Sequence, residues 1–287
     1  MQPAFSVVMP CLNGVRFLER ALRSVLDQAD PADEVMAVDG GSTDGSVETI
    51  RRYSERLAWW VSEPDAGQSS ALNKAFARAR NPFLLWINAD DVLLPGTLAT
   101  ARAHLGADPS CSWLAGNVLY LDESDRVLWC ARDGEWHDFL FRHAPVRVYG
   151  PTSIFRREAW DAAGRFDEGL RYAMDTDLWL RFRRRGLRFH RIPHYCWGFR
   201  VHAGSRTTPD LMGRPDAAMR AELDCVAEKN GLAITRAGLL QQRLWRLLNG
   251  CYARAWFDTV RWRGRRVEGF LNAKTQRRKD AKGFCSH

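Results

Sequence analysis

Three groups of acidic and polar residues each follow a short apolar run in the first hundred residues. They are the stretches 39–45 (DGGSTDG), 63–67 (EPDAG) and 88–91 (NADD). Like charges at one place repel, and a bound divalent cation or a donor-rich ligand offsets that cost. Asp90 and Asp91 offer the hard oxygen ligands that Mg²⁺ and Mn²⁺ prefer. A cation held there could neutralise a leaving diphosphate, which makes phosphate chemistry the first hypothesis.

Each acidic stretch also has a purely structural explanation. Asp90-Asp91 fits a turn followed by a helix cap, because Asp is favoured in both places. Asp39 is compatible with a glycine-rich turn capped by Asp44, or with a hydrogen bond to a nucleotide base. The glycines at 40, 41 and 45 lack the G-x-G-x-x-G spacing, so a nicotinamide enzyme is disfavoured.

A second pair of carboxylates, Asp175 and Asp177, begins a predicted helix over 175–185. One interpretation is capping, since the helix dipole favours negative charge there. The other is a general base that removes a proton from an attacking hydroxyl. His202 is a candidate ligand for metal or diphosphate, although an isolated histidine is more often structural.

The elements that would position these residues are short strands alternating with amphipathic helices. This order predicts an α/β fold with a mainly parallel, Rossmann-like sheet flanked by helices. Ligands of such sheets bind beyond the carboxyl ends of the strands, where the acidic groups stand. Helices are expected over 15–26 and after Asp44, Gln68 and Pro95. The strands are expected at Phe5–Met9, Glu34–Val38, Ala58–Val61 and Phe83–Ile87.

The rest of the chain divides into two parts. The aromatic, irregular stretch 111–154 is predicted to complete the sheet and form the acceptor side. A polar joint at 207–215 then suggests a boundary between a catalytic domain (1–206) and a helical, basic C-terminal extension (207–287). The last residues, 273–287, are polar and expected to be frayed.

Residues 236–266 hold eight arginines against one acid, with leucines at helical spacing and three tryptophans between them. Two interpretations stay open. The segment is either a membrane-surface helix, which would suit a lipid-linked acceptor, or a helix packed on the catalytic domain with its arginines in water. Nucleic acid is disfavoured, because the acidic strand ends would repel phosphates and no recognised motif is present.

Composition narrows the class of protein. The 287 residues are 46% hydrophobic and 26% charged with a net charge of +8, as in an ordinary globular protein. Seven scattered cysteines indicate neither a zinc cluster nor a disulfide framework, so a reducing cytoplasm is expected. The alternative within the cytoplasm is a peripheral position on the inner face of the membrane. No apolar run approaches the length of a membrane-spanning helix, and the N-terminus does not read as a signal peptide.

Taken together, five motifs resemble glycosyltransferase family two, with the GT-A fold. The resemblance covers residues 5–206, and the order and spacing of the motifs match. Two departures are Asn88, where the family's DxD motif often begins with Asp, and Met174, where Glu is usual; both keep the second carboxylate. The motifs are Pro10-Cys11-Leu12-Asn13, the stretch 39–45, Asp65-Ala66-Gly67-Gln68, the stretch 88–91 and Met174-Asp175-Thr176-Asp177-Leu178-Trp179.

The resemblance implies a role for each motif. Asp90 and Asp91 would hold Mn²⁺ or Mg²⁺, Asp175 would be the catalytic base, and the segment with His202 would close over the diphosphate. The implied nucleotide-binding residues are Pro10, Leu12, Asn13, Asp39, Asp65 and Gly67.

The implied activity is inverting transfer of a sugar from a UDP-, GDP- or dTDP-linked donor to a saccharide or lipid-linked saccharide, in surface polysaccharide or glycan assembly. Two alternatives stay open. A sugar-phosphate nucleotidyltransferase would need a glycine-rich loop with a basic residue, where this chain has 10–14 (PCLNG). A non-catalytic nucleotide-sugar-binding scaffold would keep the fold without a working base.

Overall fold

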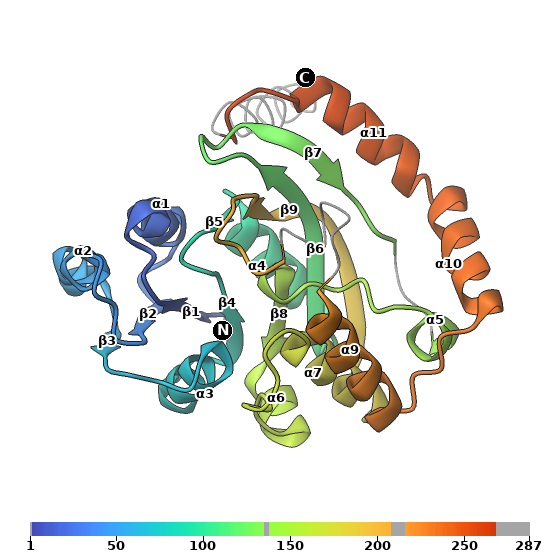
Figure 1. Ribbon diagram of the computed structural model, residues 1–287, viewed down its shortest axis with the longest axis horizontal. Helices are drawn as coiled ribbons and strands as arrows, with labels where there is room; N and C mark the ends of the chain where they lie inside the picture. Colours follow the sequence, from blue (N-terminus) through green and yellow to red (C-terminus); the bar gives the residue numbers. More distant parts are fainter. Residues whose placement is uncertain (1, 135–137, 208–215, 268–287) are drawn as a thin grey trace.

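The computed structural model describes residues 2–134, 138–207 and 216–267. Its strands form one curled sheet in the order β3-β2-β1-β4-β8-β6-β9-β5, with β7 paired to β6 (Figure 1). Helices lie against both faces of this sheet, which confirms the α/β class and the layered arrangement expected from the sequence.

The first half of the sheet is parallel. Strands β2 and β4 flank β1 in parallel register, and β3 continues the sheet beyond β2. All four carboxyl ends therefore meet at one edge, and the acidic stretches follow three of them. The strands are β1 (Phe5–Cys11), β2 (Glu34–Asp39), β3 (Trp59–Ser62) and β4 (Phe83–Trp86), all at the predicted places.

The second half of the sheet is mixed: β6, β7 and the start of β8 lie in the stretch 111–154 predicted to complete the sheet, whereas β5 and β9 lie outside that stretch. Strand β6 pairs antiparallel with β7 and β8 but parallel with β9, and β9 pairs antiparallel with β5. All nine residues of β6 are buried, so its sequence lacks the alternation that marks a half-exposed strand. These strands are β5 (Val92–Leu93), β6 (Trp113–Leu121), β7 (Val127–Ala131), β8 (Ser153–Arg156) and β9 (Phe189–Arg200).

Alternate residues of β1 enter two different cores. Val7 packs among α1 (Val15–Leu26), α2 (Ser46–Arg52) and α4 (Thr97–Ala107). Val8 packs on the opposite face of the sheet, beneath three further helices. These are α3 (Gln68–Arg78), α6 (Arg157–Ala163) and α7 (Met174–Arg184). Shorter elements are α5 (Asp138–His143), η1 (Ser54–Arg56) and η2 (Gly150–Thr152).

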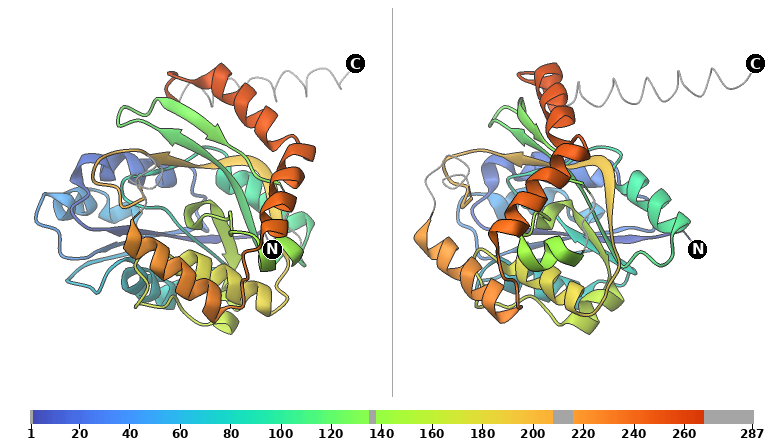
Figure 2. Two further views of the ribbon diagram at one scale, coloured as in Figure 1. Left: turned by 45° about the vertical axis from the view of Figure 1, so that its right-hand side comes forward. Right: turned by 90° about the vertical axis from the view of Figure 1, so that its right-hand side faces the viewer.

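Three helices follow the predicted boundary at 206. Helix α9 (Ala217–Lys229) packs on α7, while α10 (Arg236–Leu248) and α11 (Cys251–Trp262) run along one side of the molecule against α5 and β7 (Figures 1 and 2). The boundary itself stays a prediction. The predicted joint falls largely on 208–215, and the predicted frayed end, 273–287, also lies outside the described residues. Within the described ranges, no helix has the length and hydrophobicity that crossing a bilayer requires.

Candidate active site

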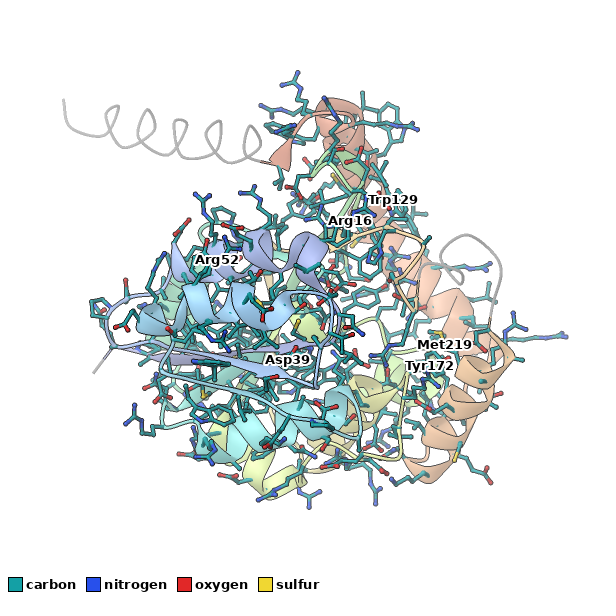
Figure 3. All side chains as sticks on the ribbon, turned by 60° about the vertical axis from the view of Figure 1, so that its left-hand side comes forward. Arg16, Asp39, Arg52, Trp129, Tyr172 and Met219 are labelled. Carbon is teal, nitrogen blue, oxygen red and sulfur yellow. The ribbon has the colours of Figure 1, made fainter. Side chains whose placement is uncertain are left out.

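A cavity of about 540 Å³ opens at the carboxyl ends of the parallel strands. Its walls come from the β1–α1 connection, the segments after β3 and β4, the residues before α7 and the segment 199–207. In Figure 3, Arg16 and Tyr172 mark two of these walls. A volume of this order accommodates a ligand the size of a nucleotide sugar.

Five of the six residues predicted to bind the nucleotide line this cavity: Pro10, Leu12, Asn13, Asp65 and Gly67. Asn13 adopts a positive φ of 50°, and its side-chain oxygen accepts a hydrogen bond from Thr43 N at 3.0 Å. This bond ties the loop after β1 to the loop after β2. Leu12 is consequently left 62% exposed at the cavity wall, an apolar surface on which a flat base can pack.

Asp39, the sixth predicted residue, does not line the cavity. It is fully buried at the end of β2, where Oδ2 accepts hydrogen bonds from Gly41 N, Ser42 N and Ser62 Oγ and Oδ1 accepts from Ser42 Oγ. In this structure Asp39 therefore organises its own glycine-rich loop. A direct contact with a base stays a prediction that requires the loop to rearrange.

Asp90 and His202 meet at the cavity, although they are far apart in the sequence. His202 Nε2 lies 3.0 Å from Asp90 Oδ2, and both residues line the cavity. The ring of Phe17, on α1, packs against the imidazole at 5.1 Å between centroids. A carboxylate oxygen and an imidazole nitrogen at one point are a donor set that fits Mn²⁺ or Mg²⁺.

Asp91 also borders the cavity, but its two oxygens are already engaged. Oδ1 accepts from Arg200 N at 2.9 Å and Oδ2 accepts from the Asn88 amide at 3.0 Å. Burial, together with the neighbouring charge of Asp90, raises the pKa of Asp91 well above its usual range. Asp90 is thus the better-placed candidate of the pair, and the role of either residue as a metal ligand stays a prediction.

Arg200 is a buried cation that the sequence indicated only as part of the closing segment. Its Nε donates to the Asp90 carbonyl at 2.8 Å, and its guanidinium pairs with Asp125 at 2.6 Å. It also stacks over the ring of Phe17. Arg200 therefore fixes the Asp90 loop to the turn between β6 and β7, a role that only the fold could reveal.

Other positive side chains at the cavity were missed at the level of the sequence. Arg16, Arg171 and Arg206 all line it. Cations at these positions suit a ligand that carries a diphosphate. Their signal in the sequence was weak because arginine is frequent throughout this chain.

Asp175 lies in the first turn of α7, one turn beyond Arg171 and Tyr172, which line the cavity. It is half-buried; Oδ2 accepts from Gly150 N at 2.9 Å, and Oδ1 accepts from Thr176 N at 2.7 Å. Burial raises the pKa of this carboxyl, and the two N–H donors oppose that shift. Asp175 is absent from the cavity lining, so its role as base remains to be tested.

Helix α9 holds the start of α7 in place. The carboxylate of Glu222 accepts hydrogen bonds from the backbone N–H groups of Arg171, Tyr172 and Ala173 at 2.6–2.9 Å. These are donors that precede the first turn of the helix, where negative charge is favoured. The first helix of the C-terminal extension thus supports the cavity wall and the turn that carries Asp175.

Comparison with known proteins now identifies the family. Residues 6–160, more than half of the chain, match the family described as "Glycosyl transferase family 2". The chain belongs to glycosyl transferase family 2. This finding confirms the resemblance that the five motifs carried.

Related sequences support the same assignment. The chain is 30% identical to the uncharacterized protein MT1568 of Mycobacterium tuberculosis over 77% of its own length and 75% of that protein. It is 28% identical to the succinoglycan biosynthesis protein ExoU of Rhizobium meliloti over 66% of its length. This match spans only 59% of the Rhizobium protein, and the match to an uncharacterized glycosyltransferase of Rickettsia prowazekii spans 58% of that protein.

Solved structures share the fold at low sequence identity. The mannosyltransferase PcManGT from Pyrobaculum calidifontis, in complex with GDP-Man and Mn²⁺, matches 96% of this chain and 80% of its own with a TM-score of 0.61 and 22% identity. Residues 1–349 of TarS from S. aureus, in complex with UDP-GlcNAc, match 78% of this chain and 66% of their own with a TM-score of 0.59 and 18% identity. The GT-A fold expected from the motifs is confirmed.

Proposed function

We propose that the chain is a metal-dependent, inverting glycosyltransferase that moves a sugar from a nucleotide diphosphate donor to an acceptor hydroxyl. The observation that carries this proposal is the meeting of Asp90 and His202 at a cavity that five of the predicted nucleotide-binding residues also line. Two structures of the same fold hold such donors, UDP-GlcNAc in TarS and GDP-Man with Mn²⁺ in PcManGT.

Asp90 is proposed as the anchor of the divalent cation, with His202 beside it, and Asp91 as the residue that supports the loop. When bound, the cation supplies Lewis-acid neutralisation of the charge on the departing diphosphate. Arg16, Arg171 and Arg206 lie around the same cavity and add positive charge toward the phosphates.

Asp175 is proposed as the general base. Its carboxylate takes the proton from the acceptor hydroxyl while the oxygen forms a bond to the anomeric carbon, and the bond from that carbon to the diphosphate oxygen breaks. The attack and the departure are on opposite faces, so the configuration inverts. The raised pKa makes the ionised Asp175 a stronger base than an ordinary carboxylate.

The test is to identify the donor and then the stereochemistry of the product. A thermal-shift screen of UDP, GDP, dTDP and their sugars with and without Mn²⁺ selects the donor, because a specific ligand stabilises the fold by mass action. NMR of the product formed with a matched acceptor should show the anomeric configuration opposite to that of the donor. A retained configuration would overturn the single-displacement mechanism.

Two other outcomes would favour the alternative functions. Binding of a nucleotide sugar without turnover on any acceptor would favour the scaffold, and release of pyrophosphate from a nucleoside triphosphate would favour a nucleotidyltransferase.

The acceptor side is proposed to face a membrane through α10 and α11. Both helices place a polar side chain against the protein: Gln242 donates to the Pro145 carbonyl at 2.9 Å, and Asp258 accepts from Tyr195 at 2.6 Å. Trp262 of α11 is buried, but seven other large apolar side chains point to solvent with 55–73% of their surface exposed. They are Leu240, Leu244, Leu247, Leu248, Trp256, Phe257 and Val260.

The positive charge around this apolar face favours binding to an anionic lipid surface. Seven arginines between 236 and 266 are exposed, and the single acid of that range, Asp258, is paired with Arg132. A second copy of the chain would bring two sets of arginines together and be repelled, whereas acidic headgroups attract them. Aromatic and leucine side chains beside arginines suit the headgroup boundary. A lipid-linked saccharide would reach the enzyme at such a surface.

Flotation with vesicles tests this placement. The double variant Leu248→Gln/Phe257→Gln is expected to lose binding to phosphatidylglycerol-containing vesicles, because it removes apolar surface without changing charge. Arg243→Gln/Arg254→Gln should weaken binding by about 2 kcal/mol, at about 1 kcal/mol per arginine near an anionic surface. The matched control is Arg51→Gln/Arg52→Gln on α2, which removes the same charge elsewhere (Figure 3). Equal loss in the control, or no binding by the unaltered chain, would refute the membrane face.

A further inference from the structure

A second cluster of ligand-type side chains lies away from the cavity, where α4, the connection after α4 and the start of β9 meet. His104 is in the last turn of α4, Cys111 precedes β6 and His190 is the second residue of β9. One ligand atom of each lies within 4.8 Å of the other two. His104 Nε2 and His190 Nδ1 are 2.9 Å apart. None of the three residues lines the cavity.

Asp108 orients one of these histidines. Its Oδ2 lies 3.5 Å from His190 Nε2, and its Oδ1 accepts hydrogen bonds from both the backbone and the hydroxyl of Ser110. A carboxylate beside Nε2 favours the tautomer with a proton on that nitrogen, which leaves the lone pair of Nδ1 directed at the cluster. Metal-ligating histidines typically have such a carboxylate on the other ring nitrogen.

The cysteine completes a soft donor set. Cys111 is fully buried, and in the metal-free arrangement its thiol donates a hydrogen bond to the Trp113 carbonyl at 3.4 Å. His104 and His190 are half-buried. Two imidazoles and a thiolate match the ligands of Zn²⁺ and differ from the pair of one carboxylate and one imidazole at the cavity.

We propose that His104, Cys111 and His190 bind a zinc ion that links α4 to β9. Binding releases the proton of the Cys111 thiol to solvent and breaks the His104–His190 hydrogen bond. The proton of His104 moves from Nε2 to Nδ1 by exchange with solvent, so that Nε2 of His104, Nδ1 of His190 and the Cys111 thiolate all direct a lone pair at the ion. A water molecule supplies the fourth position of the tetrahedron, and Asp108 stays on His190 Nε2. Because His190 lies far along the chain from His104 and Cys111, the spacing of the three residues gives no sign of the site.

The zinc ion would stabilise the fold and take no part in the transfer reaction. Helix α4 packs beside β9, and the far end of β9 carries Arg200, which holds the Asp90 loop. Zinc is expected to raise the temperature of unfolding, since a ligand that binds only the folded chain stabilises it. Donor binding at the cavity is expected to be independent of zinc, so failure of this proposal leaves the proposed transferase activity untouched.

The first test measures metal content and the cobalt spectrum of the full chain. Protein refolded with Zn²⁺ and passed through a desalting column should retain about one zinc per chain. Co²⁺ in its place should give a thiolate-to-metal charge-transfer band in the near ultraviolet. Cys111→Ser should abolish the band and His190→Gln should strongly reduce metal retention, while Cys225→Ser, which alters an exposed thiol on α9, should change neither. A band that survives in Cys111→Ser would overturn the assignment.

X-ray absorption on the unaltered, zinc-loaded chain keeps the proposal testable if the variants do not fold. The expected first shell has one sulfur at about 2.3 Å and two imidazole nitrogens at about 2.0–2.1 Å. A shell of oxygens and nitrogens without sulfur, or no zinc retained by a folded chain, would show that the three side chains form only a hydrogen-bonded cluster.

Discussion

Asn88 gives the two carboxylates that follow it different surroundings. Its amide donates to Asp91 and its carbonyl oxygen accepts from Gln68 at 2.8 Å, so it holds Asp91 in the wall and leaves Asp90 beside His202. An amide serves here better than a carboxylate, because the amide can donate to the buried Asp91 and accept from Gln68 at the same time. The departure from the usual first Asp thus has a local physical reason.

Asn88→Asp is expected to destabilise the fold at neutral pH by about 1–3 kcal/mol, because a buried carboxylate loses its donor. The new pair shares a proton, so one of the two pKa values is raised in the folded state. The loss of folding free energy caused by Asn88→Asp is then small at acid pH and grows as the pH rises through the raised pKa. Urea denaturation at two pH values measures this effect. An equal cost at both would contradict the proposed contact.

The rate should depend on the ionisation of Asp175. Burial raises the pKa of this carboxyl, and the base works only when deprotonated, so kcat/KM should fall as pH decreases through the raised value. The acid limb is therefore expected above the range in which an ordinary aspartate titrates. A pH profile with the preferred donor and acceptor measures it. A rate that stays flat down to the ordinary range would show that another group accepts the proton.

At the scale of elements, the predictable helices and strands are those with a regular pattern. Helix α1 was predicted from its apolar spacing, and the parallel strands from their short apolar runs. Strand β9 was not predicted, because polar residues such as His190, Arg191 and His194 interrupt its apolar positions. The periodicity of helix α10 was predicted, but its orientation was not: four of its leucines are exposed, while Gln242 packs against the protein, contrary to the usual placement of apolar and polar side chains.

The contact of α10 with α5 depends on Gly238. A Cβ at this position would lie 1.8 Å from the His143 carbonyl oxygen. Replacing Gly by Ala in an exposed helix stabilises the helix by up to about 1 kcal/mol. At Gly238 the overpacking against α5 should outweigh this gain, so Gly238→Ala is expected to destabilise the protein by about 1–3 kcal/mol. Thermal unfolding of Gly238→Ala checks the sign, with the exposed neighbour Ala237→Gly as the reference for helix propensity alone. A more stable Gly238→Ala would refute the close packing.

At the scale of the whole molecule, the sheet edge brings together what the sequence keeps apart. The sequence was sufficient to predict that Asp90, Asp65 and the residues after β1 share one site, since parallel strands end at one edge. It was not sufficient to show that Asp39 turns into its own loop, or that Glu222 supports the helix of the proposed base. Those features depend on loop side chains and on contacts between distant elements.

The central claim is that Asp90 binds the metal–diphosphate and Asp175 removes the acceptor proton. The most direct measurement compares donor affinity by calorimetry with release of nucleoside diphosphate for the unaltered chain, Asp90→Asn and Asp175→Asn. Asp175→Asn is expected to keep donor affinity and lose about 10²–10⁴-fold in turnover, while Asp90→Asn should lose the part of donor binding that requires Mn²⁺. Undiminished turnover in Asp175→Asn, or Mn²⁺-dependent binding that survives in Asp90→Asn, would contradict the account.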